Sequence, residues 1–276
     1  MPADLARDWS STDEFTVRSN RPEPGFTLTY GFGTDRGLSR ELNEDSLIAK
    51  DPVFAVADGM GGHEAGEIAS ALCVRTLGSM PQLAPGVRSA TAVALQRCIL
   101  AADSQIRNAT GGRAGTTLTG VVVAEHMGVP YWLVMNIGDS RTYRVNGGEF
   151  RQISVDHSEV QELAEAGSIT REEATVHPRR NVVTRALGTG GENEADFWLL
   201  PIQDGDRMLI CSDGLTGELG DEHMFRILST VEKPQDAVDA LIHEALLSGG
   251  RDNVTAIVVD ARIELNDAAR TGTGSS

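Results

Sequence analysis

Long apolar runs and basic clusters are scarce in this chain of 276 residues. No stretch approaches the roughly 18 consecutive apolar residues that suggest a membrane span, and the N-terminal 20 residues lack the apolar core of a signal peptide. The chain has 24 Lys and Arg residues against 40 Asp and Glu residues, a formal charge of −16. Because such a surface repels phosphate backbones, we expect no nucleic acid partner. Because no long apolar run is present, we also expect no membrane association.

Cysteines are also few. The spacing of Cys73, Cys98 and Cys211 fits no zinc pattern, and their odd number argues against a disulfide framework. Each lies in an apolar stretch, which is typical of buried free thiols in a reducing compartment. We therefore expect a soluble, cytoplasmic protein, and a monomer.

Several common catalytic fingerprints are absent: the chain has no GxGxxG motif, no P-loop and no GxSxG elbow. His63 and Glu64 begin like a zinc protease motif, but the second histidine is missing. No linker or internal repeat divides the chain, so we expect one large domain over residues 26–262. Residues 1–25 are interpreted as a flexible leader or a loosely docked strand, and residues 263–276 as a polar tail.

Between these ends, the hydrophobic pattern alternates between strand-like and helix-like segments. Strands are predicted at Phe26–Gly33, Val53–Ala57, Thr117–Ala124, Tyr131–Ile137, Asn181–Leu187, Arg207–Cys211 and Val254–Val259. Helices are predicted at Ala65–Leu77, Val87–Asn108, Glu159–Glu165, Asp221–Ser229 and Pro234–Leu247. Because two helices come together and a block of strands follows, the order favours a sheet-rich α+β fold over regular βαβ alternation.

Aspartates stand at the ends of the apolar runs. Asp58, Asp139 and Asp213 each follow one such run, and Asp252 precedes another. A single Asp-Gly after a strand is usually a turn. Four such positions are more informative, because converging carboxylates would repel one another and their pKa values would rise unless a cation were bound. Carboxylate and carbonyl oxygens suit Mg²⁺ or Mn²⁺ better than zinc.

Phosphate recognition needs a positive group, and Arg40 is a candidate because a guanidinium can bind two phosphate oxygens at once. Its neighbours Glu44 and Asp45 place acidic groups close by in the sequence. A lone arginine is more often a solvated surface residue.

Taken together, these segments resemble the PPM family of metal-dependent phosphatases, also called PP2C-like. The motifs are Arg40–Ser46, Val56–His63, Gly115–Leu118, Asn136–Arg141, Asp156–Ser158, His177–Asn181, Cys211–Leu215 and Gly250–Thr255. They occur in the family's order from about Tyr30 to Asp260. The resemblance implies a four-layer α-β-β-α sandwich, in which two packed antiparallel sheets are flanked by helices and the metals lie in a cleft at one edge.

The resemblance also implies roles for individual residues. Asp58 matches the aspartate that bridges two metals, and Gly59 matches a glycine that contributes its carbonyl oxygen. Asp213 and Asp252 match the other direct ligands. Glu44 matches a carboxylate that reaches the metal through water.

Two further matches complete the site. Asp139 corresponds to a ligand of a third, weaker metal in bacterial members, where Asp213 also takes part, and Arg40 corresponds to the phosphate-binding arginine. The implied cofactors are therefore Mn²⁺ or Mg²⁺, two per active site, with a possible third. The implied reaction is hydrolysis of phosphoserine and phosphothreonine on proteins by direct attack of a metal-bridging hydroxide. The implied partners are phosphorylated proteins, including Ser/Thr kinases and their substrates.

The general acid is left open. Eukaryotic relatives have a histidine where this chain has Met60, and methionine cannot donate a proton. His63 could protonate the leaving group or could instead cap the following helix, and a metal-bound water could also serve. Residues 158–184 resemble the flap that borders the cleft in bacterial members. The alternatives to a kinase-opposing phosphatase are a non-catalytic binding module and a phosphatase of anti-sigma-factor antagonists.

Overall fold

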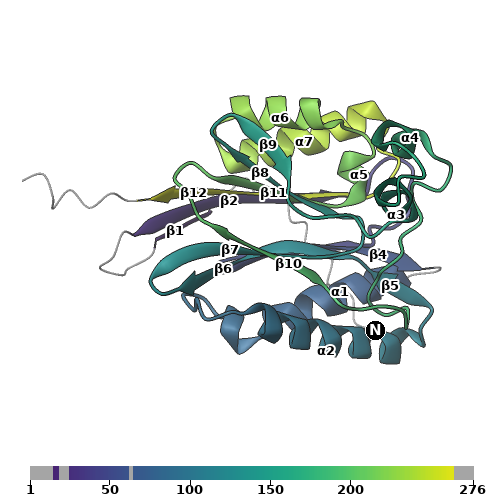
Figure 1. The fold of residues 1–276 in the computed structure, drawn as a ribbon, viewed down its shortest axis with the longest axis horizontal. Coiled ribbons are helices and arrows are strands. Elements are labelled where there is room, and N and C mark those ends of the chain that lie inside the picture. The colour runs from purple at the N-terminus through teal and green to yellow at the C-terminus, as the bar shows by residue number, and fades with distance from the viewer. Residues whose placement is uncertain (1–14, 19–24, 62–64, 264–276) are drawn as a thin grey trace, which may run out of the picture.

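The structure, a computed structural model, describes residues 15–18, 25–61 and 65–263. Two antiparallel sheets pack face to face, and a pair of helices covers the outer face of each (Figure 1). Helices α6 and α7 lie on one sheet, and α1 and α2 lie on the other. The predicted α+β, four-layer sandwich is confirmed.

The first sheet has the strand order β1-β2-β12-β11-β8-β9 and the second has the order β10-β7-β6-β4-β3, with β5 paired to the end of β4. The strands of the first sheet are β1 (Phe15–Arg18), β2 (Phe26–Asp35), β8 (Arg141–Asn146), β9 (Glu149–Gln152), β11 (Arg207–Cys211) and β12 (Val254–Ile263). Those of the second are β3 (Asp45–Lys50), β4 (Val53–Gly61), β5 (Ala114–Thr116), β6 (Leu118–His126), β7 (Val129–Ile137) and β10 (Asp196–Pro201). The helices are α1 (Ala65–Gly78), α2 (Ala92–Thr110), α3 (Glu159–Glu165), α4 (Arg171–Val176), α5 (Asp213–Thr216), α6 (Asp221–Thr230), α7 (Pro234–Ser248) and the short 3-10 helix Pro81–Leu83.

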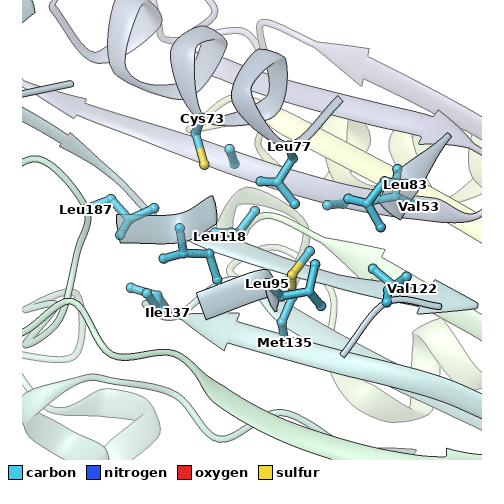
Figure 2. Close-up of a cluster of buried hydrophobic side chains, with 14 of the residues drawn as sticks. Val53, Cys73, Leu77, Leu83, Leu95, Leu118, Val122, Met135, Ile137 and Leu187 are labelled. Atoms are coloured by element: carbon cyan, nitrogen blue, oxygen red, sulfur yellow. The ribbon is translucent and has the colours of Figure 1, made fainter. Parts of the chain in front are cut away.

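Strand β4 shows how the core is divided. Successive side chains of a strand point to opposite faces of the sheet. Phe54 and Val56 therefore pack between the two sheets, whereas Val53 and Ala55 pack under the helices. In the helix-side cluster, Cys73 and Leu77 of α1 lie over side chains of the second sheet (Figure 2). Residues 53–57 of β4 are buried on both faces, so the strand leads out of a fully packed core toward the site.

Helix α2 begins five residues later than the sequence predicts. The predicted start at Val87 is wrong, because the helix is capped at Thr91, whose hydroxyl accepts a hydrogen bond from the Ala94 amide at 3.2 Å. Val87 instead donates its amide to the Ala84 carbonyl in a turn. The N-cap hydroxyl satisfies an amide that has no partner within the helix, which explains why the helix starts there.

The predicted strand at Asn181–Leu187 is also wrong. Its backbone divides its hydrogen bonds between two different segments: the Thr184 amide binds the His157 carbonyl, and the Leu187 amide binds the Thr116 carbonyl. Only isolated bridges result. A continuous ladder needs one partner strand along the whole run, and this segment has none among the described residues.

Within residues 1–25, Phe15–Arg18 form strand β1, which pairs with β2. Most of the predicted leader and tail lie outside the described residues, as does His63. In the described part of the chain, no helix has the length and apolar character that crossing a membrane requires.

Candidate active site

Asp58 lies inside a strand and not in a turn after one. The sequence places the end of the strand at Ala57, but β4 continues to Gly61 because β3 pairs with it as far as Asp58 and β5 pairs with it over Gly59–Gly61. Asp58 is opposite Asp45 of β3, and Gly59 is opposite Thr116 of β5. Asp58 is therefore fixed by the β3 ladder on one side and, on the other, by its carbonyl, which accepts a hydrogen bond from the Thr117 amide at 2.9 Å.

Asp213 and Asp252 come from neighbouring strands of the other sheet. Strands β11 and β12 are antiparallel, so the end of the first lies beside the start of the second. Asp213 opens α5 two residues after β11 ends, and Asp252 comes two residues before β12 begins. A Cβ atom on Gly214 would collide with the Asn253 carbonyl, so only glycine permits this close approach of the two segments.

Asp45 connects the two sheets at this point. Its Oδ2 accepts hydrogen bonds from Ser212 Oγ at 2.8 Å and from Thr255 Oγ1 at 2.6 Å. Its Oδ1 is buried without a hydrogen-bond partner among the described residues. Asp58 and Asp213 also interact directly through their side chains. The acidic ends of β4 and β11 therefore meet between the sheets.

Asp139 is placed by the turn after β7. Thr117 Oγ1 lies 2.8 Å from Ser140 Oγ and accepts a hydrogen bond from the Asp58 amide at 3.0 Å, which connects the Asp139 turn to β4. On the other side, the Gly138 amide donates to His157 Nδ1 at 3.2 Å. Asp139 is thus held between β4 and the base of the flap.

Glu44 and Gly59 lie at the beginning of α1. The Gly59 amide donates to the Glu44 carbonyl at 3.1 Å, and the Glu44 carboxylate contacts Gly66 and accepts its backbone N–H. A side chain on Gly59 would meet the carbonyls of Glu44 and Gly66. Three backbone segments therefore converge tightly where the glycine carbonyl is expected to contribute a ligand.

Arg40 is the only arginine given a predicted role, and its side chain is half exposed. Its Nη2 donates to Asp252 Oδ2 at 2.7 Å. The loop that carries it is anchored by Asn253, whose Nδ2 donates to the carbonyls of Arg36 and Leu42 and whose Oδ1 accepts the Glu44 amide. The arginine is therefore held beside the aspartates, with its guanidinium open to solvent.

The electrostatics reflect this crowding. Burial, followed by repulsion from Asp213 and other carboxylates, raises the pKa of Asp45 to about 7 and that of Asp139 to about 8. For the same reasons the pKa of Asp58 is raised well above its usual range, and that of Asp213 is raised. Bringing these carboxylates together without a counter-charge reduces the stability of the folded state, and so does burying Asp45 Oδ1 without a hydrogen-bond partner.

These residues fit a site for hard divalent cations. All of the side-chain donors are carboxylates, and an adjacent backbone carbonyl is available at Gly59, as Mg²⁺ and Mn²⁺ prefer. Among the described residues, no group of three or more His, Cys, Asp or Glu side chains is already arranged so that it could hold a metal ion. Mg²⁺ commonly keeps several waters and is bound through one or two carboxylates, so an open arrangement suits such an ion.

The flap, residues 158–184, borders this site. Helices α3 and α4 are capped by the hydroxyls of Ser158 and Thr170. A cavity of about 560 Å³ lies between the flap, β8 with the segment after β9, and α5, and both Asp139 and Asp213 contribute to its lining. The site therefore opens into a space large enough for substrate side chains.

From the sequence, Asp45 has no predicted role beyond its place in the motif Arg40–Ser46. The sequence also indicates His63 as a catalytic candidate, which lies outside the described residues. The hydroxyl donors Ser212 and Thr255 were missed, although both stand within three residues of a predicted ligand.

Comparison with known proteins agrees with this geometry. The family model described as protein phosphatase 2C matches residues 33–246. The chain belongs to the protein phosphatase 2C family. Among curated family members, it is 36% identical over 244 residues to the serine/threonine phosphatase stp of Listeria innocua, covering 84% of this chain and 95% of that protein.

Two further comparisons concern the phosphatase named PstP. The chain is 41% identical over 238 residues to the serine/threonine protein phosphatase PstP of Mycobacterium tuberculosis, covering 84% of this chain and 45% of the relative. The solved structure of the catalytic domain of PstP in complex with two manganese ions superposes with a TM-score of 0.77 at 36% identity, covering 86% of this chain and 99% of that one. The protein phosphatase 2C fold is therefore matched over nearly all of a solved catalytic domain.

Proposed function

We propose that this chain is a metal-dependent phosphatase that hydrolyses phosphoserine and phosphothreonine esters on other proteins. The observation that carries the proposal is the convergence of Asp58, Asp139, Asp213 and Asp252, far apart in the sequence, beside Arg40. The names of its relatives as serine/threonine phosphatases support the same substrate class.

Particular residues would hold the cations. Asp58, Asp213, Asp252 and the Gly59 carbonyl would bind two Mn²⁺ or Mg²⁺ ions, with Glu44 acting through water. Asp139, with Asp213, would contribute to a third and weaker site. When bound, the cations supply a water of lowered pKa and positive charge against the phosphoryl oxygens.

Side chains of the protein would bind the phosphoryl group and protonate the leaving group. The fork of Arg40 would bind two phosphoryl oxygens, and its bond to Asp252 orients it toward the site. The thioether of Met60 has no acidic proton and therefore cannot protonate the leaving alkoxide. His63 stays a sequence-based candidate for donating that proton. Kinase partners, a cytoplasmic location and a monomeric state also stay predictions from the sequence.

The test measures hydrolysis of p-nitrophenyl phosphate and of a phosphothreonine peptide in the presence of Mn²⁺. We expect turnover of both substrates and its loss when a chelator is added. Absence of turnover with either substrate, in protein that binds Mn²⁺, would contradict the proposal and favour a binding module.

A further inference from the structure

The cavity beside the metal site has two chemically different walls. On the core side it is lined by the carboxylates of Asp139 and Asp213, and on the flap side by Arg171 and Arg180. Its volume of about 560 Å³ exceeds what one phosphoryl group fills. A substrate segment that places its phosphoryl group at the metals would therefore extend further into the cavity.

The other arginines of this region are neutralised by partners within the protein. Arg141, which also lines the cavity, binds both oxygens of Asp156 at 2.7 to 3.0 Å. Arg179, next to Arg180, forms an ion pair with Glu159. Their charges are therefore already balanced.

Arg171 and Arg180 differ from these neighbours. Both are exposed, and neither guanidinium makes a hydrogen bond or ion pair with any described residue. Arg171 is the first residue of α4, and Arg180 follows that helix, so both are carried by the same part of the flap. Two unpaired guanidinium groups that line one cavity are well suited to an anion, because each can donate two parallel hydrogen bonds to it.

The opposite wall restricts where this anion can lie. Asp139 and Asp213 repel anions unless cations cover them, so an anionic group other than the reacting phosphoryl is favoured only on the flap side. A substrate with two anionic groups would complement both walls at once.

We propose that Arg171 and Arg180 form a second anion site, which binds a phosphate or carboxylate group close in sequence to the phosphorylated residue undergoing hydrolysis. This inference rests on the proposed phosphatase function. It defines the preferred substrates as protein segments with a second phosphoryl group or an acidic side chain near the phosphothreonine.

The experiment compares kcat/KM for three series of phosphothreonine peptides. At each of the four positions on either side of the phosphothreonine, one series carries glutamine, one glutamate and one a non-hydrolysable phosphonate analogue of phosphothreonine. Each series is assayed with the unmodified protein and with the variants Arg171→Gln, Arg180→Gln and Arg97→Gln. Arg97 is an exposed arginine of α2 on the far side of the second sheet and serves as the matched charge control.

We expect an anion at one or more positions to raise kcat/KM about tenfold over glutamine, and each flap variant to lose about threefold to tenfold of that advantage. Arg97→Gln should retain it. A gain with the phosphonate alone identifies a phosphate site, and an equal gain with glutamate identifies a general anion site. Equal rates in all three series, or an advantage that survives both flap variants, would overturn the inference. Failure to hydrolyse even the glutamine peptide and p-nitrophenyl phosphate would instead contradict the phosphatase function itself.

Discussion

Asp45 and Asp58 lie directly opposite each other on β3 and β4, so two carboxylates face one another where the sheets meet. Asp45 has one oxygen saturated by two hydroxyl groups and the other without a partner. Repulsion between the pair is among the causes that raise the pKa of Asp58. This pairing is stable only with a counter-charge or a retained proton, which determines several measurable properties.

Replacing Asp45 with asparagine should weaken metal binding. The substitution keeps the side-chain shape but removes a negative charge next to the ligands, and changes to groups that support ligands commonly cost about tenfold to a hundredfold in metal affinity. Calorimetric titration with Mn²⁺ measures the effect. Asp206→Asn is the matched control, since Asp206 is also buried but lies at the other end of β11, where it accepts hydrogen bonds from Trp132 and Arg144. Equal Mn²⁺ affinity in the two variants would contradict a role for Asp45.

Asp58→Asn should abolish phosphatase activity. A neutral amide would not serve as the ligand of two cations that we propose Asp58 to be, and the loss of the charge that those cations would supply predicts a fall in kcat of about a thousandfold or more. The assay uses p-nitrophenyl phosphate at saturating Mn²⁺, after circular dichroism has shown a folded variant. Substantial turnover at saturating metal would count against the assignment.

Asp139→Ala should separate the metal sites from one another. Asp139 sits on the turn between β7 and β8 and not on the β4 or β11 ends, so its loss should lower turnover about tenfold or more while two strong Mn²⁺ sites persist. Calorimetry and activity are measured on the same preparation. If the variant bound no Mn²⁺ tightly, the role of Asp139 in a separate, weaker site would be wrong.

The metal-free protein should lose stability as the pH rises through 7 and 8. Burial holds the pKa of Asp45 at about 7 and of Asp139 at about 8, above the usual value of 3.8. Between the usual value of 3.8 and these raised values the folded state binds more protons than the unfolded state, so the free energy of unfolding decreases as the pH increases across that range and levels off above pH 8. Thermal unfolding in a chelator should show a melting temperature several degrees lower at pH 8.5 than at pH 6.

Two additions make that measurement specific. Saturating Mn²⁺ should restore the stability at pH 8.5, and the Asp139→Asn variant should show a smaller decrease between the two pH values. A melting temperature that rises over this interval in the chelator would show that the carboxylates do not retain protons.

The strands next to the aspartates could be predicted from the sequence, but the pairing of those strands could not. Arg207–Cys211 was predicted with its observed bounds, because a continuous apolar run marks a strand buried on both faces. Strand β3 was not predicted, because Asp45–Lys50 begins and ends with a charged residue and lies at a sheet edge, where burial is only partial. Register with β4 places Asp45 opposite Asp58, and nothing local distinguishes Asp45 from Glu44 in that respect.

The two unpaired arginines of the flap cavity could not be predicted from the sequence either, because their availability also depends on contacts between distant segments. Arg179 and Arg180 are adjacent and chemically identical, yet one is paired with Glu159 and the other is not. Which arginine remains available depends on the orientation of α3 relative to the segment after α4, and this is a property of tertiary packing.

Asn253 has a consequence for how the protein would tolerate change. A single amide group holds the carbonyls of Arg36 and Leu42 and the Glu44 amide, so it closes both ends of the loop whose apex is Arg40. Aspartate at this position would put an oxygen against two carbonyl acceptors, and alanine would remove all three of these hydrogen bonds, leaving the loop fewer anchors, such as the bond from the Leu38 amide to the Gly250 carbonyl. The position of Arg40 thus depends on a residue that directly precedes β12, and substitutions at exposed positions of the loop should be tolerated better than a substitution of Asn253.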